Sequence, residues 1–261
     1  YNSLDGFLKE IKKAITVPYE EFEEKGLKDS NGEYHQISNG IIQIENEYYD
    51  SIRPKRSASN NLRPYELLKN YGIEYLEIRS IDLNPYSTIG ISLEDIEFLE
   101  LVSLYCALSD SPKINDVESI CIKENIRRSS ETGQNCNFIS SIDGDQAETP
   151  AKILTHTFLN ELKGFAKKIG AEEEKKKMFE EYCKRNETTL SMRFIEDVKN
   201  SGGVLPFVLS KSTHTKKDIN DEHLFLFEKE KELSEKEYLK EKNEDKILFE
   251  DYLEDFRGEI K

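Results

Sequence analysis

Apolar residues recur at helical spacing at the start of the chain and again over most of its second half. A stripe with a period near 3.6 predicts an amphipathic helix over residues 3–15, formed by Leu4, Phe7, Leu8, Ile11, Ala14 and Ile15. Further helices are expected over 93–108, 116–131 and from residue 150 onward. The helix over 93–108 is apolar on nearly all sides in its second half, so we expect it in the centre of a core.

Between these helical segments, shorter runs alternate charged and apolar residues in the manner of strands. Strands are predicted near 33–37, 40–49 and 73–83, with turns at Asn31-Gly32 and Asn39-Gly40 before the first two. The predicted fold class is therefore α+β, with a partial antiparallel sheet backed by a largely helical C-terminal part. Two regions are expected, 1–145 with the sheet and core helices and 146–261 with helices and an acidic amphipathic tail.

The period of two places charged and aromatic side chains on one face of the predicted sheet. Tyr75, Glu77 and Arg79 share a face in the run 73–83, and Glu45, Glu47 and Tyr49 share one in the run 40–49. Carboxylates suit Mg²⁺, and an arginine fork suits a carboxylate or phosphate, so this face is a candidate site for a cation and a small anion. An exposed sheet face with an ordinary ion pair at Glu77 explains the same pattern.

A basic segment, Arg53-Pro54-Lys55-Arg56, follows the first of these runs. Arg53, Lys55 and Arg56 are candidate nucleotide-binding residues, because lysine and arginine neutralise phosphate charge. A basic turn that balances an acidic protein is the simpler alternative. The chain contains neither GxxxxGK[ST] nor GxGxxG, so neither a P-loop nor a Rossmann site is supported.

Bulk composition narrows the classes of function. A net charge of −15 argues against nucleic acid and against an anionic membrane surface as partners. No apolar run approaches the roughly 18 residues that span a bilayer. The four cysteines form no CxxC pair, which argues against a zinc site and favours a reducing, cytoplasmic location.

Long motifs between residues 43 and 112 closely resemble the glutamate–cysteine ligase family of proteobacteria. The matching segments are Gln43-Ile-Glu-Asn-Glu-Tyr-Tyr49, Ile52-Arg-Pro-Lys-Arg56, Tyr75-Leu-Glu-Ile-Arg-Ser80, Asp82-Leu-Asn-Pro-Tyr86, Ile89-Gly-Ile91 and Cys106-Ala-Leu-Ser-Asp-Ser-Pro112. The similarity becomes loose after about residue 145.

The resemblance implies an ATP-dependent ligase that joins the γ-carboxylate of glutamate to cysteine, with Mg²⁺ as cofactor. The product would be γ-glutamylcysteine, with ADP and phosphate, in the first step of glutathione biosynthesis. By match of motif, Glu77 resembles the family's metal-binding glutamate, and Arg79 resembles the catalytic arginine that binds glutamate and the transferring phosphoryl group. Tyr49 resembles a tyrosine of the cysteine pocket.

The resemblance covers only the C-terminal half of the family, whose members are roughly twice as long. The N-terminal half, which carries most of the other metal-binding glutamates, is therefore an expected partner, and the chain alone is expected to be inactive. Two alternatives remain at this point. One is another γ-glutamyl ligase or a guanidino kinase of the same superfamily, and the other is a non-catalytic helical interaction module.

Overall fold

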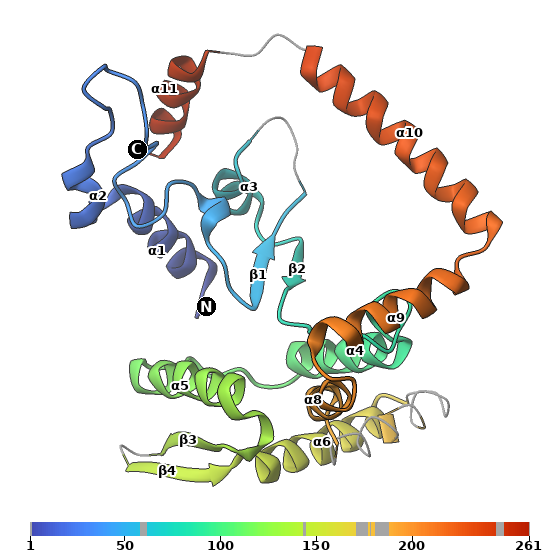
Figure 1. The fold of residues 1–261 in the computed structure, drawn as a ribbon. Coiled ribbons are helices and arrows are strands. Elements are labelled where there is room, and N and C mark those ends of the chain that lie inside the picture. Colours follow the sequence, from blue (N-terminus) through green and yellow to red (C-terminus); the bar gives the residue numbers. More distant parts are fainter. Residues whose placement is uncertain are drawn as a thin grey trace. The chain divides into compact units, whose positions relative to one another are not determined.

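The structure of the protein is a computed structural model that describes residues 2–57, 62–142, 145–170, 177, 179–180, 188–243 and 248–260. The chain divides into two compact units, Tyr1–Asp82 with Lys229–Lys261 and Leu83–Glu228. Helices dominate, and the described strands form two separate two-stranded antiparallel sheets (Figure 1). The predicted α+β class is confirmed. The predicted regions 1–145 and 146–261 stay a prediction.

The first unit contains both halves of a small sheet and the helices around it. Its elements are α1 (Leu4–Thr16), α2 (Glu20–Lys25), the 3₁₀ turn η1 (Glu45–Glu47), β1 (Ile52–Lys55), α3 (Pro64–Tyr71), β2 (Tyr75–Ile78) and α11 (Phe249–Ile260). Strands β1 and β2 pair antiparallel, and α3 lies between them in the sequence. The two strands are therefore connected through α3 rather than by a tight hairpin.

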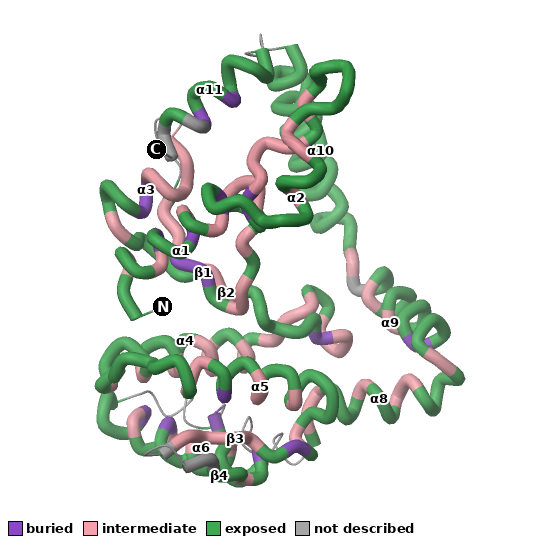
Figure 2. Tube along the Cα trace, turned by 90° about the vertical axis from the view of Figure 1, so that its left-hand side faces the viewer, coloured by how far each residue is buried: buried purple, intermediate pink, exposed green. Residues whose placement is uncertain are grey.

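The predicted apolar stripe of α1 supplies much of the first unit's core. Leu8, Ile11 and Ile15 are buried, as the spacing predicts. The core also receives Leu253 and Phe256 from α11, which are 1% and 3% exposed. Figure 2 marks these buried positions along α1 and α11. The acidic C-terminal segment thus ends in a helix that packs against the start of the chain.

The second unit is mainly helical. It contains α4 (Leu93–Leu108), α5 (Asp116–Thr132), the 3₁₀ turn η2 (Gly133–Asn135), β3 (Asn137–Ile142), β4 (Asp145–Pro150), α6 (Ala151–Lys168), α8 (Leu190–Asn200) and α9 (Val204–Asp218). Helix α10 (Asp221–Asn243) contains the boundary between the two units, which falls between Glu228 and Lys229. No helix in the described part of the chain is long and apolar enough to cross a membrane.

Helix α4 only partly fulfils the expectation of a central helix. Its Ser92 cap and Asp95 form a capping box at the predicted start. Phe98, Leu101 and Val102 pack against the buried cluster of α6, but no residue of α4 is itself fully buried. Its apolar residues are thus spread around the helix, and part of them stays at the surface of this unit.

The predicted strands at 33–37 and 40–49 are wrong. Residues 40–44 form bends that lead into η1, because side chains bind the backbone groups that a neighbouring strand would have bound. The backbone N–H of Gln43 donates to Glu47 Oε2 at 2.7 Å, and Gln43 Oε1 accepts the backbone N–H groups of Ile37 and Ser38 at 2.7 and 3.0 Å. Near 33–37 a single bridge joins Lys28 and Tyr34. The predicted strand at 73–83 is confirmed over Tyr75–Ile78, in its first half.

Candidate functional site

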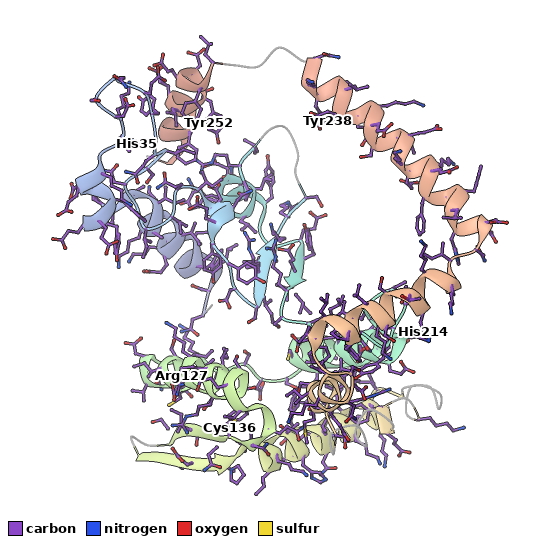
Figure 3. The ribbon with its side chains drawn as sticks, in the orientation of Figure 1. His35, Arg127, Cys136, His214, Tyr238 and Tyr252 are labelled. Atoms are coloured by element: carbon purple, nitrogen blue, oxygen red, sulfur yellow. The ribbon has the colours of Figure 1, made fainter. Side chains whose placement is uncertain are left out.

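The pairing of β1 with β2 brings the basic segment against the charged strand. Arg53 lies opposite Glu77 and Lys55 opposite Tyr75 in the antiparallel register. Because alternate residues share a face, these four side chains lie on one face of the sheet. The six predicted site residues lie in these strands or close to their ends: Tyr49, Arg53, Lys55, Arg56, Glu77 and Arg79. Figure 3 draws the side chains of the protein in the orientation of Figure 1, where β1 and β2 can be located.

Glu77 and Arg79 form the centre of the cluster, as strand parity predicts. Arg79 Nη2 donates to Glu77 Oε1 at 3.0 Å, and its Nε lies 2.9 Å from Oε2. Lys55 Nζ is 3.8 Å from the same Oε2. The hydrogen bond from Arg79, with the charges of Lys55, Arg79 and Arg53, holds the pKa of Glu77 below its usual range. The same contact raises the pKa of Arg79.

One oxygen of Glu77 is unusual. Oε2 is shielded from solvent and accepts no hydrogen bond from the described residues, since the Arg79 Nε contact is an ion pair without hydrogen-bond geometry. A carboxylate oxygen has two lone pairs, so Oε2, which forms ion pairs with Arg79 and Lys55, keeps acceptor capacity for a further group.

Tyr49 stands beside Arg79. The guanidinium carbon of Arg79 lies 5.5 Å from the centre of the Tyr49 ring, within the range of a cation–π contact. The tyrosine is 70% exposed, so most of the ring faces solvent. Tyr49 therefore extends the charged cluster with an accessible aromatic surface.

The three candidate nucleotide-binding cations differ in their surroundings. Arg53 is only 8% exposed, and Lys55 contacts Glu77 alone among the described carboxylates. Arg56 donates through Nη1 to the backbone oxygen of Tyr71 at 2.6 Å, at the end of α3. Arg56 is thus already engaged in satisfying carbonyl groups that the helix leaves unpaired.

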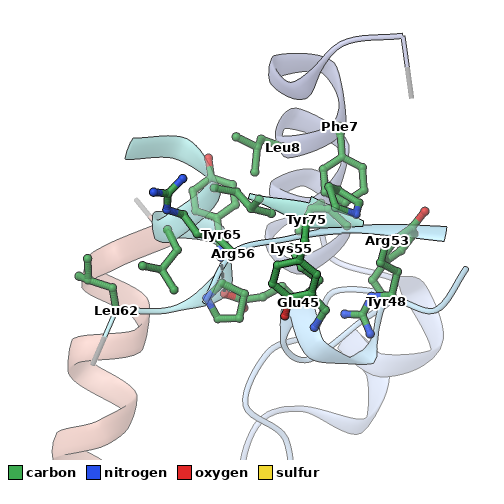
Figure 4. A pocket seen from close by; sticks show the side chains of 15 residues that line it. Phe7, Leu8, Glu45, Tyr48, Arg53, Lys55, Arg56, Leu62, Tyr65 and Tyr75 are labelled. Atoms are coloured by element: carbon green, nitrogen blue, oxygen red, sulfur yellow. Dashed lines mark hydrogen bonds between the residues drawn. The ribbon is translucent and has the colours of Figure 1, made fainter. Parts of the chain in front are cut away.

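A pocket of about 260 Å³ lies between the basic segment, α1 and α3 (Figure 4). Its lining combines Arg53, Lys55 and Arg56 with apolar and aromatic side chains that include Phe7, Leu8, Tyr48, Tyr65, Leu67 and Tyr75. Sequence reasoning placed Tyr75 on the charged face. It missed the contributions of α1 and α3, because these come from tertiary packing and carry no local signal.

Glu45, whose role the sequence leaves open, lines this pocket. It is 6% exposed and forms an ion pair with Arg63, and it accepts the backbone N–H of Tyr65 at 3.2 Å. Arg63 in turn stacks on Phe256 of α11, with its guanidinium carbon 3.6 Å from the ring centre. Glu45 therefore joins η1 to α3 and is not available as a ligand for a cation.

The described residues contain no group of three or more His, Cys, Asp or Glu side chains arranged to hold a metal ion. Glu77 is consequently a single carboxylate among cations. It fits one position in the ligand set of a hard divalent ion, and the oxygen without a hydrogen bond is the donor atom best suited to it.

Comparison with known proteins points to the glutamate–cysteine ligases. A family model described as glutamate–cysteine ligase matches residues 1–129. Over its whole length the chain is 31% identical to a glutamate–cysteine ligase of Aliivibrio salmonicida and covers 52% of it. Over 77% of its length it is 32% identical to the enzyme of Erwinia tasmaniensis and covers 40% of it.

A solved structure of a glutamate–cysteine ligase is also similar to this chain. The glutamate–cysteine ligase of Francisella tularensis, determined in complex with AMP, aligns with 97% of this chain at a TM-score of 0.83 and 26% identity. The alignment covers 52% of that protein. The chain thus spans about half the length of the Francisella tularensis ligase and of the Aliivibrio salmonicida ligase.

Proposed function

This chain is a relative of the glutamate–cysteine ligases, and we propose from that relationship that it supplies part of such a ligase's active site. The reaction joins the γ-carboxylate of glutamate to the amine of cysteine at the expense of ATP. Its product is γ-glutamylcysteine, the precursor of glutathione. A cytoplasmic location belongs to this proposal, and the described cysteines, which form no disulfide, agree with it.

The observation that carries the proposal is the excess of positive charge around Glu77. Three cations, Arg53, Lys55 and Arg79, act on this one carboxylate. In a protein of net charge −15, such an excess on one sheet face is suited to anionic substrates. Glutamate and ATP are both anionic, and both need neutralisation before one can attack the other.

The chemistry requires activation of glutamate, because a carboxylate is a poor electrophile. An oxygen of the γ-carboxylate attacks the γ-phosphorus of ATP, the bond to the β–γ bridging oxygen breaks, and ADP leaves. The cysteine amine then attacks the γ-glutamyl carbon, loses a proton and displaces phosphate. Both steps depend on positioning and on stabilisation of charge rather than on a protein nucleophile.

Arg79 is proposed as the catalytic residue that binds the glutamate carboxylate and the transferring phosphoryl group. Its planar guanidinium can form two parallel hydrogen bonds, which suits both groups. Glu77 holds Nη2 and Nε of Arg79 in place and so fixes the direction in which the remaining donors point.

Glu77 is proposed as a ligand of Mg²⁺. When bound, magnesium would neutralise phosphate charge during transfer. Glu77 Oε2 is the atom that fits this role, because it is shielded and accepts no hydrogen bond from the described residues. Since these residues offer no three-ligand group, the remaining ligands are assigned to the half of the ligase that this chain does not match.

Substrate recognition is assigned to the neighbours of this pair. Tyr49 is proposed to line the cysteine pocket, where its exposed ring lies next to Arg79. Arg53, Lys55 and Arg56 are proposed to bind the nucleotide. The adjoining pocket supports this, because it combines these cations with aromatic rings on which a base could stack.

The proposal makes separate statements about ligation and about nucleotide binding. The purified 261-residue chain is expected to form no γ-glutamylcysteine, since one carboxylate cannot hold the metal ions of the reaction. It is still expected to bind ATP, measured by calorimetry. Lys55→Met should weaken this binding by about tenfold, a loss typical of one charged contact.

Lys13→Met is the matched control, because Lys13 is an exposed lysine of α1 that does not line the pocket. Its ATP affinity should stay within about twofold of the parent chain. γ-Glutamylcysteine formation by the chain alone would contradict the assignment of the other metal ligands elsewhere. An equal loss of ATP affinity in Lys55→Met and Lys13→Met would contradict the assignment of the basic segment as the nucleotide-binding site.

A further inference from the structure

The second unit contains a polar pocket that the ligase chemistry does not use. It has a volume of about 210 Å³ and lies between the loop after residue 84 and the second half of α9. Its polar lining is formed by Ser87, Thr88, Ser210, Lys211, His214 and Thr215, with Pro85 and Tyr86 completing it. None of these residues is acidic, although the chain has 52 acidic residues.

The loop wall of this pocket is held in one conformation by its own hydrogen bonds. Asn84, which is 8% exposed, accepts the backbone N–H of Tyr86 at 2.9 Å through its side chain. Its own N–H donates to the carbonyl of Gly90 at 2.7 Å. Gly90 has a φ of +80°, which a glycine adopts at low cost. The loop therefore closes on itself and presents a fixed surface.

Tyr86 anchors this loop to α8 and α9, where it contacts Asp197 and Phe207. Its hydroxyl donates to Asp197 Oδ2 at 2.6 Å. Burial and this contact raise the pKa of Tyr86 to about 12, so the hydroxyl remains a donor. The guanidinium carbon of Arg193 lies 3.7 Å from the centre of the Tyr86 ring, and its Nε lies 3.9 Å from Asp197 Oδ2. Asp197 is thus already engaged by a hydroxyl and an arginine.

Lys211 is the main cation of the pocket. Its Nζ lies 4.7 Å from the ring centre of Tyr86 and 5.5 Å from that of Phe207. Within the described residues it forms no ion pair with a carboxylate. The two rings hold the ammonium group in place while leaving its hydrogen-bond donors for another acceptor.

His214 adds a ring nitrogen that can accept a hydrogen bond. Its Nδ1 lies 2.7 Å from the carbonyl oxygen of Ser210, and a carbonyl can only accept, so Nδ1 carries the hydrogen. In the neutral ring, Nε2 is then an acceptor. The pocket thus combines an ammonium donor, hydroxyl donors and one acceptor.

We propose that this pocket binds a small phosphate group, as inorganic phosphate or as a small phosphomonoester. Lys211 and the hydroxyls of Thr88, Ser210 and Thr215 supply donors for its oxygens, and Nε2 of His214 accepts the hydrogen of a protonated phosphate. The volume admits such a group but is smaller than the roughly 300 Å³ at which drug-sized ligand pockets begin. The proposal does not depend on the ligase assignment.

Calorimetry on the 261-residue chain with inorganic phosphate tests the proposal, and glycerol 3-phosphate in a second titration distinguishes the two sources. Phosphate should bind saturably, and sulfate, which has no hydrogen to give to Nε2 near pH 7, should bind several-fold more weakly. Acetate should bind more weakly still, because it has two oxygens. Tighter binding of sulfate than of phosphate would overturn the role of His214.

Lys211→Met should weaken phosphate binding by about tenfold, and Lys216→Met should change it by less than about twofold. Lys216 is exposed on the same helix and does not line the pocket, so both variants lose the same charge from α9. His214→Gln serves as a second variant if Lys211→Met does not fold. An equal loss in the Lys216 variant, or no saturable binding of the parent chain, would overturn the proposal.

Discussion

The two small sheets of this protein differ in how their charges are balanced. In β1–β2, the three cations Arg53, Lys55 and Arg79 act on one carboxylate, Glu77. Around β3–β4, the two arginines of α5 are shared by three carboxylates: Arg127 pairs with Glu124 and Glu131, and Arg128 pairs with Glu124 and Glu148. The first sheet has an excess of positive charge, and the second has none.

This difference separates a candidate binding surface from a structural one. In the second network each of the two arginines has two carboxylate partners, at distances between 2.6 and 3.0 Å, so its positive charge is balanced. In the first, one carboxylate cannot satisfy three cations. Both sheets carry Arg–Glu pairs, so the presence of such a pair is a poor guide to function. The balance of charge is more informative.

The largest effect expected from this comparison concerns the two glutamates that lie in the sheets. In the complete ligase, Glu77→Gln should lower the rate of γ-glutamylcysteine formation by about 100-fold, since it removes the proposed metal ligand and the partner of Arg79. Glu148→Gln makes the same change in β4 and should alter the rate by less than about twofold. Similar losses in both variants would show that the two sheets do not differ in function.

A smaller effect is expected at Tyr49. Tyr49→Leu removes the ring beside Arg79 and should raise the KM for cysteine by about tenfold, while the KM for ATP changes by less than about twofold. Tyr238→Leu, at an exposed tyrosine of α10, is the control and should change neither constant. Equal increases in both constants for Tyr49→Leu would favour another member of the superfamily with a different acceptor.

The smallest effect is on stability and belongs to the balanced network. Hydrogen bonds from Arg127 and Arg128 lower the pKa of Glu124 from 4.5 to about 2. Because the folded pKa is the lower one, the stabilisation is complete above pH 4.5 and is lost as the pH falls towards 2. The melting temperature of Glu124→Gln should thus lie on the order of 1–2 °C below that of the parent at pH 6.

That difference in melting temperature should shrink below pH 4.5 and vanish near pH 2. Thermal unfolding followed by circular dichroism over this range measures it. Glu131→Gln is the control on the same helix, because Glu131 pairs with only one arginine, and its effect should be smaller at every pH. A difference that grows on acidification would contradict the direction of the pKa shift.

The sequence was sufficient to predict the features that depend on local periodicity. The stripe of α1, the capping box at Ser92 and the shared face of Glu77 and Arg79 all follow from spacing within one element. The strand at 40–49 failed for a different reason. Its alternation is genuine, but the backbone N–H of Gln43 donates to Glu47 Oε2, and the Gln43 side chain binds the N–H groups of Ile37 and Ser38. The groups that would join the two predicted strands are therefore already bound, and this competition is not visible in a periodic pattern.

Long-range contacts limited the prediction of the candidate site. Arg56 was grouped with its neighbours by charge, whereas it donates to a backbone carbonyl at the end of α3, fifteen residues later. The apolar walls of the pocket come from α1 and α3, which no motif associates with the basic segment. The packing of Phe256 against Arg63 is likewise a tertiary contact, and it joins α11 to the segment that precedes α3.

The helix between β1 and β2 has a consequence for how the cluster is assembled during folding. Arg53 and Glu77 meet only after the intervening segment has been brought into a loop, so their pairing carries an entropic cost that a two-residue hairpin avoids. Contacts with greater sequence separation generally form more slowly. We therefore expect β3–β4 to form early on the folding pathway and the charged cluster to be completed after α3 has docked.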